Sequence, residues 1–192
     1  HNTYEQTKHE SEHLLRAAMR DVPIAVHRPS IVVGDSKTGR TGAWKVLYYP
    51  LKVISRGWLP LVPYDPDGRL DIVPVDFVAD AVLALSRDQA TVGHTFHLAA
   101  GPGRDATIGE LTSALFRRLD RRKPLRIKPV WFRRILRPAM MLMPLPKLRR
   151  TLEKGLVYRP YLELRLQFDT AAADAALAPG GLRCPGVLEY ID

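Results

Sequence analysis

Hydrophobic positions at the start of the chain change from helical to strand-like spacing. An apolar stripe predicts a helix over residues 2–19, and its members are Leu14, Leu15, Ala18 and Met19. Pro23 ends this pattern. Residues 24–26 are a short apolar run typical of a buried parallel strand, and residues 30–34 continue it. Because proline has no N–H group, we expect the strand to loosen near Pro29.

The alternation of strands and helices continues as far as residue 119. Asp76 is a suitable N-cap for a helix, and Thr107 with Glu110 has the spacing of a capping box. The predicted elements are a loop over 35–42, a helix over 44–56, loop and turns over 57–68, a strand over 70–75, a helix over 77–86, a strand over 95–99 and a helix over 108–119. Strands that alternate with helices in this way predict a parallel or mixed α/β sheet.

Beyond residue 119 the pattern becomes basic, proline-rich and mostly helical. We therefore divide the chain into an α/β part over residues 1–119 and a smaller, mainly helical lobe over residues 120–192. Between residues 131 and 155 the lobe has a strip in which Trp, Met and Leu side chains are interleaved with arginine and lysine. The sequence shows no internal repeat.

Composition and charge narrow the class of protein. The 192 residues are 46% hydrophobic and 26% charged, which is typical of a soluble globular protein. A single cysteine, Cys184, excludes a disulfide within the chain and favours the cytoplasm. The net charge of +9 is concentrated between residues 116 and 165, so the lobe should attract phosphates, acidic proteins or anionic lipid. Few aromatic residues and no recognised motif argue against nucleic acid, and we predict no metal site.

Tyr4 and Lys8 are the strongest chemical signal in the sequence. Their spacing of four places both side chains on one face of a helix. A phenol ordinarily has a pKa of about 10, and a neighbouring ammonium favours its phenolate form. Such a phenol can give a proton to a carbonyl oxygen while hydride arrives at the carbon. A Tyr-x-x-x-Lys pair is common by chance, so its context decides its meaning.

Four segments supply that context, and together they resemble a known enzyme family. They are residues 2–8 with Glu12, residues 26–39, residues 71–81 and residues 95–99. In this order and at these separations they resemble the extended short-chain dehydrogenase/reductase family. The second segment, which ends in Gly-Asp-Ser-Lys-Thr-Gly, is most similar to the branch of fatty acyl-CoA reductases and thioester reductase domains. The resemblance covers residues 1–115 well and becomes faint beyond them.

This resemblance implies a fold and a set of site residues. It implies the C-terminal part of a Rossmann-like, doubly wound sheet, with Tyr4 as catalytic acid/base and Lys8 as its partner on the nicotinamide ribose. The residues that would lie against the nicotinamide are Pro29, Ser30, Ile31 and Val32. The cofactor would be NADP or NAD, and NADPH is the preferred expectation. The family's glycine-rich phosphate turn is absent and the chain starts at His1, so we expect an N-terminal truncation and poor cofactor binding by this chain alone.

The function implied is NAD(P)H-dependent reduction of an acyl thioester, from acyl-CoA or an acyl carrier protein, to aldehyde or alcohol. Alternatives on the same scaffold are a nucleotide-sugar epimerase/dehydratase and a hydroxysteroid-type dehydrogenase. A non-catalytic dinucleotide-binding module is disfavoured, because relatives of that kind tend to lose the tyrosine or the lysine. The basic lobe would bind a small or carrier-bound acyl substrate, and its apolar strip would line an acyl tunnel or rest on a membrane surface. A homodimer through the Tyr4 helix is also left open.

Simpler roles are expected for several other polar residues. Asp76 is interpreted as a helix cap, and His27 as a core residue whose hydrogen bonds are satisfied. Pro29 would also serve to end a strand. His9 and His13 should be solvated, and Cys184 has no activating base beside it in the sequence.

Overall fold

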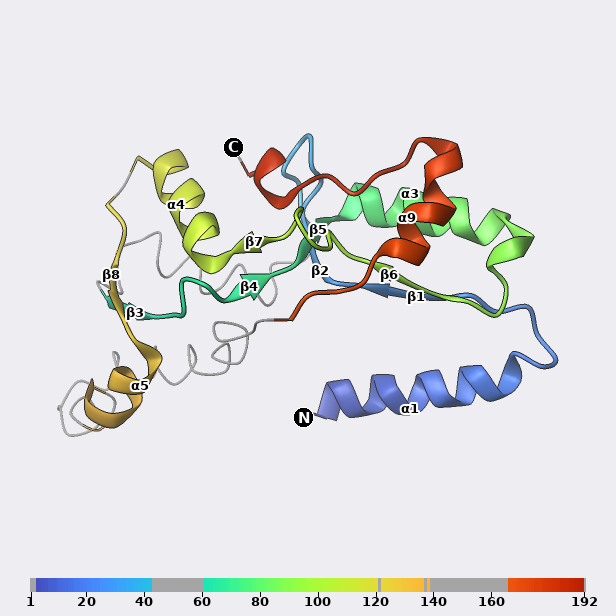
Figure 1. The fold of residues 1–192 in the computed structure, drawn as a ribbon, viewed down its shortest axis with the longest axis horizontal. Helices are drawn as coiled ribbons and strands as arrows, with labels where there is room; N and C mark the ends of the chain where they lie inside the picture. The colour runs from blue at the N-terminus through green and yellow to red at the C-terminus, as the bar shows by residue number, and fades with distance from the viewer. Residues whose placement is uncertain (1–2, 43–60, 121, 137, 139–165, 192) are drawn as a thin grey trace.

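The fold was analysed in a computed structural model, which describes residues 3–42, 61–120, 122–136, 138 and 166–191 (Figure 1). The predicted helix over 44–56 lies outside these residues, as does most of the apolar and basic strip beyond residue 138. The described part alternates strands and helices as far as residue 118 and then continues in shorter elements. The α/β class predicted from the sequence is therefore confirmed.

Two parallel strand pairs form the centre of the fold. β1 (Val26–Pro29) pairs with β6 (Thr95–Leu98), and β2 (Ile31–Val33) pairs with β5 (Ile72–Pro74). One stretch of chain, residues 26–33, thus takes β6 as partner in its first half and β5 in its second. The break between the halves falls at Ser30, directly after Pro29, as the missing N–H of proline predicts.

Two smaller strand pairs extend away from this centre. β3 (Leu61–Pro63) pairs in parallel with β8 (Leu125–Ile127), and β4 (Arg69–Leu70) pairs antiparallel with β7 (Ala106–Thr107). The prediction of loop and turns over 57–68 is therefore wrong at 61–63. A run of only three residues that ends in proline has too little pattern to indicate a strand, and it is the pairing with distant β8 that orders it.

The strand predicted over residues 70–75 is interrupted at Asp71. The buried Asp71 carboxylate accepts hydrogen bonds from the backbone N–H groups of Ala100 and Gly101, both at 2.9 Å. Its side chain thereby ties the chain between β4 and β5 to the turn that follows β6. Two backbone donors compensate for the burial of this carboxylate, which would otherwise be costly.

Helices cover the strands and continue toward the C-terminus. Thr107 and Glu110 form the predicted capping box, in which each side chain accepts a hydrogen bond from the other residue's backbone N–H. The helices are α1 (Thr3–Ala18), α3 (Val75–Arg87), α4 (Ile108–Arg118), α5 (Pro129–Trp131) and α9 (Ala171–Leu177). The shorter turns are η1 (Gln89–Thr91), the π-helical η2 (Phe132–Leu136), η3 (Ala178–Gly180) and η4 (Val187–Glu189). No helix in the described ranges is long and apolar enough to cross a membrane.

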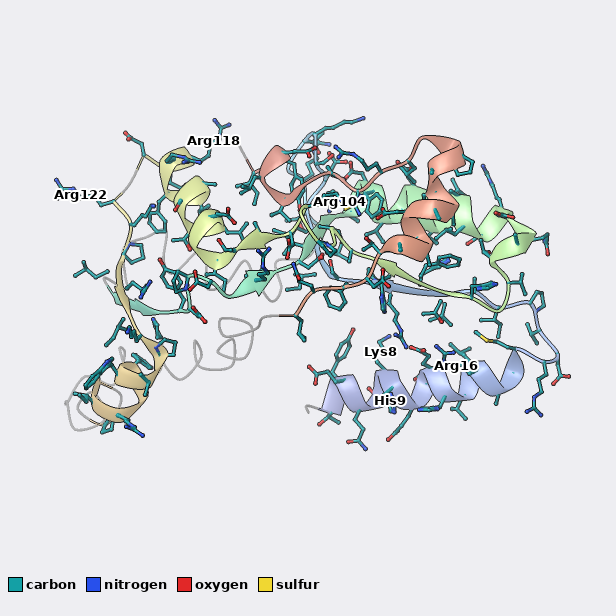
Figure 2. All side chains as sticks on the ribbon, in the orientation of Figure 1. Lys8, His9, Arg16, Arg104, Arg118 and Arg122 are labelled. Atoms are coloured by element: carbon teal, nitrogen blue, oxygen red, sulfur yellow. The ribbon has the colours of Figure 1, made fainter. Side chains whose placement is uncertain are left out.

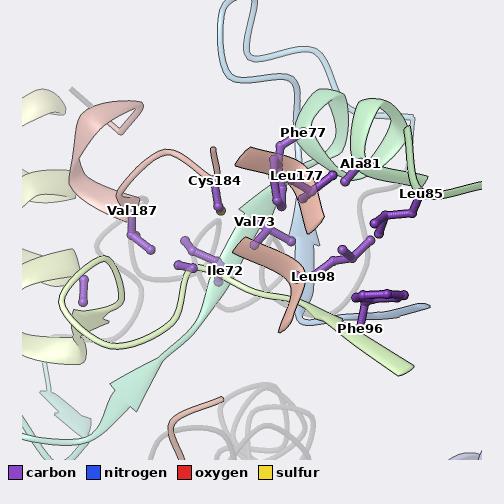
Figure 3. Packing of buried hydrophobic residues seen from close by; sticks show 13 residues of the cluster. Ile72, Val73, Phe77, Ala81, Leu85, Phe96, Leu98, Leu177, Cys184 and Val187 are labelled. Atoms are coloured by element: carbon purple, nitrogen blue, oxygen red, sulfur yellow. The ribbon is translucent and has the colours of Figure 1, made fainter. Parts of the chain in front are cut away.

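The hydrophobic core lies where β5 and β6 meet α3 and α9 (Figure 3). Val73 and Leu98 are completely buried at its centre, and Phe77 and Leu85 of α3 pack over them. The C-terminal segment closes the core with Leu177, Cys184 and Val187. The chain therefore returns to the sheet after residue 166, and its end is part of the central packing.

Helix α1 does not take part in this core. None of its residues is buried, and Leu14 of the predicted apolar stripe is 74% exposed. The helix predicted from this stripe is confirmed, but its leucines are exposed within the described structure. Figure 1 shows α1 alongside β1 and separate from the layer of α3 and α9.

Truncation of a central side chain tests this description of the core. Leu98→Ala should lower the free energy of unfolding by about 2–5 kcal/mol, because it removes buried methyl groups and leaves a cavity. Urea denaturation measures this change. The matched control is Leu83→Ala on α3. Because Leu83 is half exposed, this substitution should lower the free energy of unfolding by well under about 1 kcal/mol. Equal losses in the two variants would contradict the placement of the core.

Candidate active site

Tyr4 and Lys8 lie together on the first two turns of α1. The Lys8 ammonium is 5.8 Å from the centre of the Tyr4 ring, within the range of a cation–π contact. The Tyr4 side chain is 69% exposed. The structure thus confirms the expected juxtaposition, and both polar ends remain accessible to a ligand.

Two side chains further along α1 bind the helix to the strands. Glu12 accepts a hydrogen bond from Nε of Arg28 in β1 at 2.9 Å and a second from the same guanidinium. Arg16 donates to the hydroxyl of Thr95 in β6 at 3.0 Å and also pairs with Glu12. Figure 2 shows Lys8 and Arg16 on the side of α1 that faces the strands.

These contacts fix the direction of α1 relative to β1. Arg16 reaches Thr95, which is opposite Val26 in the sheet, while Glu12 reaches Arg28. The helix therefore runs antiparallel to the strand. The four residues from Glu12 back to Lys8 cover about 6 Å along the helix axis. The two residues from Arg28 forward to Ser30 cover about the same length along the extended chain. Continued at these spacings, we expect Lys8 to come near the level of Ser30 and Tyr4 near that of residues 31–32.

The segment from Pro29 to Val32 offers both an apolar surface and an unused polar group. Pro29 is exposed, the Val32 side chain is 41% exposed, and Ile31 packs against the core. The Ser30 hydroxyl oxygen is buried and has no hydrogen-bond partner in the described structure. A buried hydroxyl without a partner costs free energy, so this segment suits a ligand that brings a polar group to Ser30.

His27 differs from the sequence prediction. Its ring is partly buried, and its Nε2 atom is enclosed with no hydrogen-bond partner among the described residues. The expectation of a fully satisfied core histidine is therefore wrong. Burial lowers the pKa of His27 below its ordinary value, because the charged form would lose its hydration.

The polar loop over residues 34–42 is held in a compact shape by two carboxylates. Asp35 accepts hydrogen bonds from the backbone N–H groups of Lys37 and Thr38 and from the Thr38 hydroxyl. Gly34 is required at the start of the loop, since a Cβ atom there would lie 2.9 Å from the carbonyl oxygen of Gly39. Hydrogen bonds within the loop thus order its turn.

Asp76 is the second of these carboxylates and corrects a prediction. Helix α3 begins at Val75 with Pro74 as its N-cap, and no side chain caps it. Asp76 instead accepts hydrogen bonds from the backbone N–H of Ser36 at 2.9 Å and from its hydroxyl at 2.6 Å. Burial raises the pKa of Asp76, but these hydrogen bonds outweigh that effect and leave the pKa below its ordinary value. The residue read as a helix cap is a support for the loop.

His97 in β6 extends the contacts of Arg28 toward the C-terminal segment. Its Nε2 atom lies 3.2 Å from the Arg28 guanidinium, and its Nδ1 atom lies 3.1 Å from the carbonyl oxygen of Asp169. Arginine only donates, so Nε2 must accept and Nδ1 must carry the proton. The neutral Nδ1–H form of His97 therefore links β1 to the segment before α9.

Other candidate groups are outside this arrangement. Burial raises the pKa of the Cys184 thiol to about 12, so this cysteine is a core residue and not a nucleophile. His9 and His13 are exposed, as predicted, with their Nε2 atoms 3.0 Å apart. No group of three or more metal-ligating side chains occurs within the described ranges.

Comparison with known proteins identifies the family. The family model described as male sterility protein matches residues 1–82. A nonribosomal peptide synthetase, FrzA, from Cladobotryum sp is 30% identical over 191 residues, which are 95% of this chain and 18% of that protein. The crystal structure of the terminal R domain from the myxalamid PKS-NRPS pathway superimposes with a TM-score of 0.76 at 25% identity, over 100% of this chain and 48% of that one. The chain belongs to the extended short-chain dehydrogenase/reductase family.

A further member of this family matches more locally. The fatty acyl-CoA reductase wat of Drosophila melanogaster is 34% identical over 92 residues, which are 46% of this chain and 18% of that protein. The chain thus spans about a fifth of these curated relatives and about half of the solved R domain. The Rossmann-like fold inferred from the sequence resemblance is confirmed.

Sequence reasoning on this reductase-family chain missed the groups that hold the site in place. Glu12 follows Tyr4 and Lys8 at the same spacing of four, and this repeat was the available signal for it. Arg28 sits beside Pro29 in the sequence, but nothing local indicates that it contacts α1. The pairing of Asp76 with Ser36 joins residues 40 positions apart and had no signal in the sequence.

Replacement of Asp76 tests the support of the loop. Asp76→Asn should lower the free energy of unfolding by about 1–2 kcal/mol at pH 7, because it weakens two hydrogen bonds to Ser36. The folded-state pKa is depressed, so this stabilisation is present above the ordinary pKa of 3.8 and is lost as pH falls through the folded value. Urea denaturation between pH 3 and 7 should show the two proteins converging in acid. Asp80→Asn, exposed on the same helix, is the control and should change little.

Proposed function

We propose that this chain carries the catalytic acid of an NAD(P)H-dependent reductase that converts an acyl thioester to aldehyde or alcohol. The observation that carries the proposal is the pairing of Tyr4 and Lys8 on one face of α1, a helix whose Glu12 and Arg16 contact the strands next to residues 29–32. The proton donor would thereby face an exposed apolar surface with an unpartnered hydroxyl.

The relatives support thioester reduction over other reactions of the family. One is named a fatty acyl-CoA reductase, and fatty acyl-CoA is a thioester. Another is a nonribosomal peptide synthetase, and the superimposed structure is a terminal R domain from a PKS-NRPS pathway. The polar loop over 34–42 begins with the sequence Gly-Asp-Ser-Lys-Thr-Gly. This sequence resembles the branch of fatty acyl-CoA reductases and thioester reductase domains.

The residues present fit a nicotinamide cofactor, for which NADPH is our expectation. Pro29 and Val32 offer an apolar face to a planar ring, and the Ser30 hydroxyl is a partner for a carboxamide. Lys8 makes no ion pair with a described carboxylate, so its ammonium is available to donate to ribose hydroxyls. The phosphates of the dinucleotide would be bound by residues other than Lys8 and residues 29–32.

A mechanism follows from these positions. A reduced nicotinamide, when bound, would supply hydride for the thioester carbonyl carbon. Tyr4 gives its phenolic proton to the carbonyl oxygen, and Lys8 stabilises the resulting phenolate by its charge. The product would be a hemithioacetal. Its hydroxyl proton passes to the sulfur as the C–S bond breaks, which gives aldehyde and free thiol, and the Tyr4 phenolate regains a proton from water. Reprotonated Tyr4 could then protonate the aldehyde oxygen in a second reduction to alcohol, for which a second reduced nicotinamide would supply the hydride.

Removal of the Tyr4 hydroxyl tests this function. In the protein encoded by the complete gene, Tyr4→Phe should lower kcat for reduction of a long-chain acyl-CoA by about 10²- to 10⁴-fold, because it removes the proton donor. The loss of NADPH or NADH absorbance measures the rate. His13→Gln on the same helix is the control and should keep its activity. Tight cofactor binding without thioester turnover would instead favour a nucleotide-sugar or hydroxysteroid substrate.

We further propose an acyl carrier protein as the source of the thioester. Six cations, here called the basic edge, are exposed between the end of α4 and the residue after β8: Arg117, Arg118, Arg122, Lys123, Arg126 and Lys128. Figure 2 shows Arg118 and Arg122 projecting outward from this edge. None of the six forms an ion pair with a described carboxylate, so their charge is available to an acidic partner. Dimerisation and membrane contact remain predictions.

Charge reversal at the basic edge tests the carrier. Arg117→Glu with Arg118→Glu and Arg122→Glu should raise KM for a carrier-bound thioester at least tenfold at low salt, and leave KM for the same acyl group on pantetheine unchanged. Steady-state kinetics at two salt concentrations measure the effect. The control reverses Arg20 and Arg87, which are also exposed but outside this edge. An equal rise for both substrates would contradict a docking role.

A further inference from the structure

The position of α1 relative to the strands must be fixed by something other than burial in the core. The helix carries Tyr4 and Lys8, and a displacement of about 1 Å in such groups can cost a hundredfold in rate. None of its residues is buried, and none belongs to the hydrophobic core, so apolar packing in the described structure contributes little to its position. Polar contacts between α1 and the strands are therefore the stronger candidates for setting the position of Tyr4.

The ion pair of Glu12 and Arg28 has the geometry to do this. The guanidinium donates to both carboxylate oxygens, through Nε to Oε2 and through Nη2 to Oε1. Such a bidentate pair restricts orientation as well as distance, unlike a contact through a single atom. Only 19% of the Glu12 side chain is exposed. The hydrogen bonds from Arg28 hold the pKa of Glu12 below its ordinary value, so the pair is charged at neutral pH.

The two partners belong to the two halves of the candidate site. Glu12 is one helical turn beyond Lys8 and two beyond Tyr4, on the same face of α1. Arg28 precedes Pro29, where the surface for the nicotinamide begins. The pair is thus a direct link between the helix that holds the proton donor and the strand that would hold the cofactor.

We propose that Glu12 and Arg28 are positioning residues, which hold Tyr4 and Lys8 at the height of residues 29–32 through their bidentate ion pair. This inference rests on the proposed function, because it assigns the pair a role in the same proton transfer. Neither side chain touches the reacting atoms. Arg16 supports the arrangement by its contacts with Glu12 and Thr95, and His97 holds the far side of the Arg28 guanidinium.

A double-mutant cycle in the protein encoded by the complete gene tests the proposal. Glu12→Gln and Arg28→Gln should each lower kcat for acyl-CoA reduction by 10- to 100-fold, with KM for NADPH changed less than threefold. If the residues act through each other, the double variant should be no slower than the slower single variant. Arg28→Lys, which keeps the charge but loses the planar fork, should recover only part of the rate.

The control and the other outcomes separate this role from plain stability. Arg183→Gln breaks an exposed ion pair with Glu189 and should leave kcat unchanged. Thermal melting should place all variants within a few degrees of wild type, so that a lost kcat reports position and not unfolding. The positioning role would be overturned if the fold-losses in kcat of the two single variants multiplied in the double variant, or if neither single variant lost kcat. In either case turnover by the wild-type protein would still support the proposed function. A wild-type protein that reduces neither thioester nor aldehyde would overturn the function, and the inference with it.

Discussion

The stretch of chain from residue 26 to residue 33 is the constraint on which the rest of the described structure depends. It pairs with β6 before Ser30 and with β5 after it, so one segment aligns two strands whose paired residues follow it by about 70 and about 40 positions respectively. Both strands contribute residues to the hydrophobic core. The change of partner occurs where Pro29 lacks an N–H. The unpartnered Ser30 hydroxyl lies at the same point of the chain, so the candidate binding surface adjoins this break.

Apolar packing and charged hydrogen bonds stabilise different parts of this molecule. Apolar contacts join β5, β6, α3 and α9 into a core that excludes water. Helix α1 and the loop over 34–42 are held instead by carboxylates, namely Glu12, Asp35 and Asp76. Hydrogen bonds lower the pKa of all three, so each of these supports is present at neutral pH and weakens only in acid. Groups placed in this way remain accessible to ligands, which burial in a core would prevent.

Local patterns in the sequence predicted those elements whose causes are local. The capping box of Thr107 and Glu110, the loosened strand at Pro29 and the shared face of Tyr4 and Lys8 each depend on residues a few positions apart. Predictions failed where distant partners compete. Asp76 looks like a helix cap, but the loop offers it two donors from Ser36. The contacts of α1 with the strands, through Glu12 and Arg16, also join residues far apart in the sequence and were not predicted.

The sequence by itself determined the family, the order of the main strands and helices up to residue 119 within the described ranges, and the identity of the candidate acid, because these depend on local spacing and on motifs in a fixed order. Only the tertiary structure decided how the motifs face one another. The direction of α1 against β1 and the link between Glu12 and Arg28 depend on contacts across 16 or more residues. Such contacts leave no periodic signal in the sequence, since any nearby arginine could in principle neutralise the same glutamate. The fold selects one of them by placing Arg28 on the strand beside the helix.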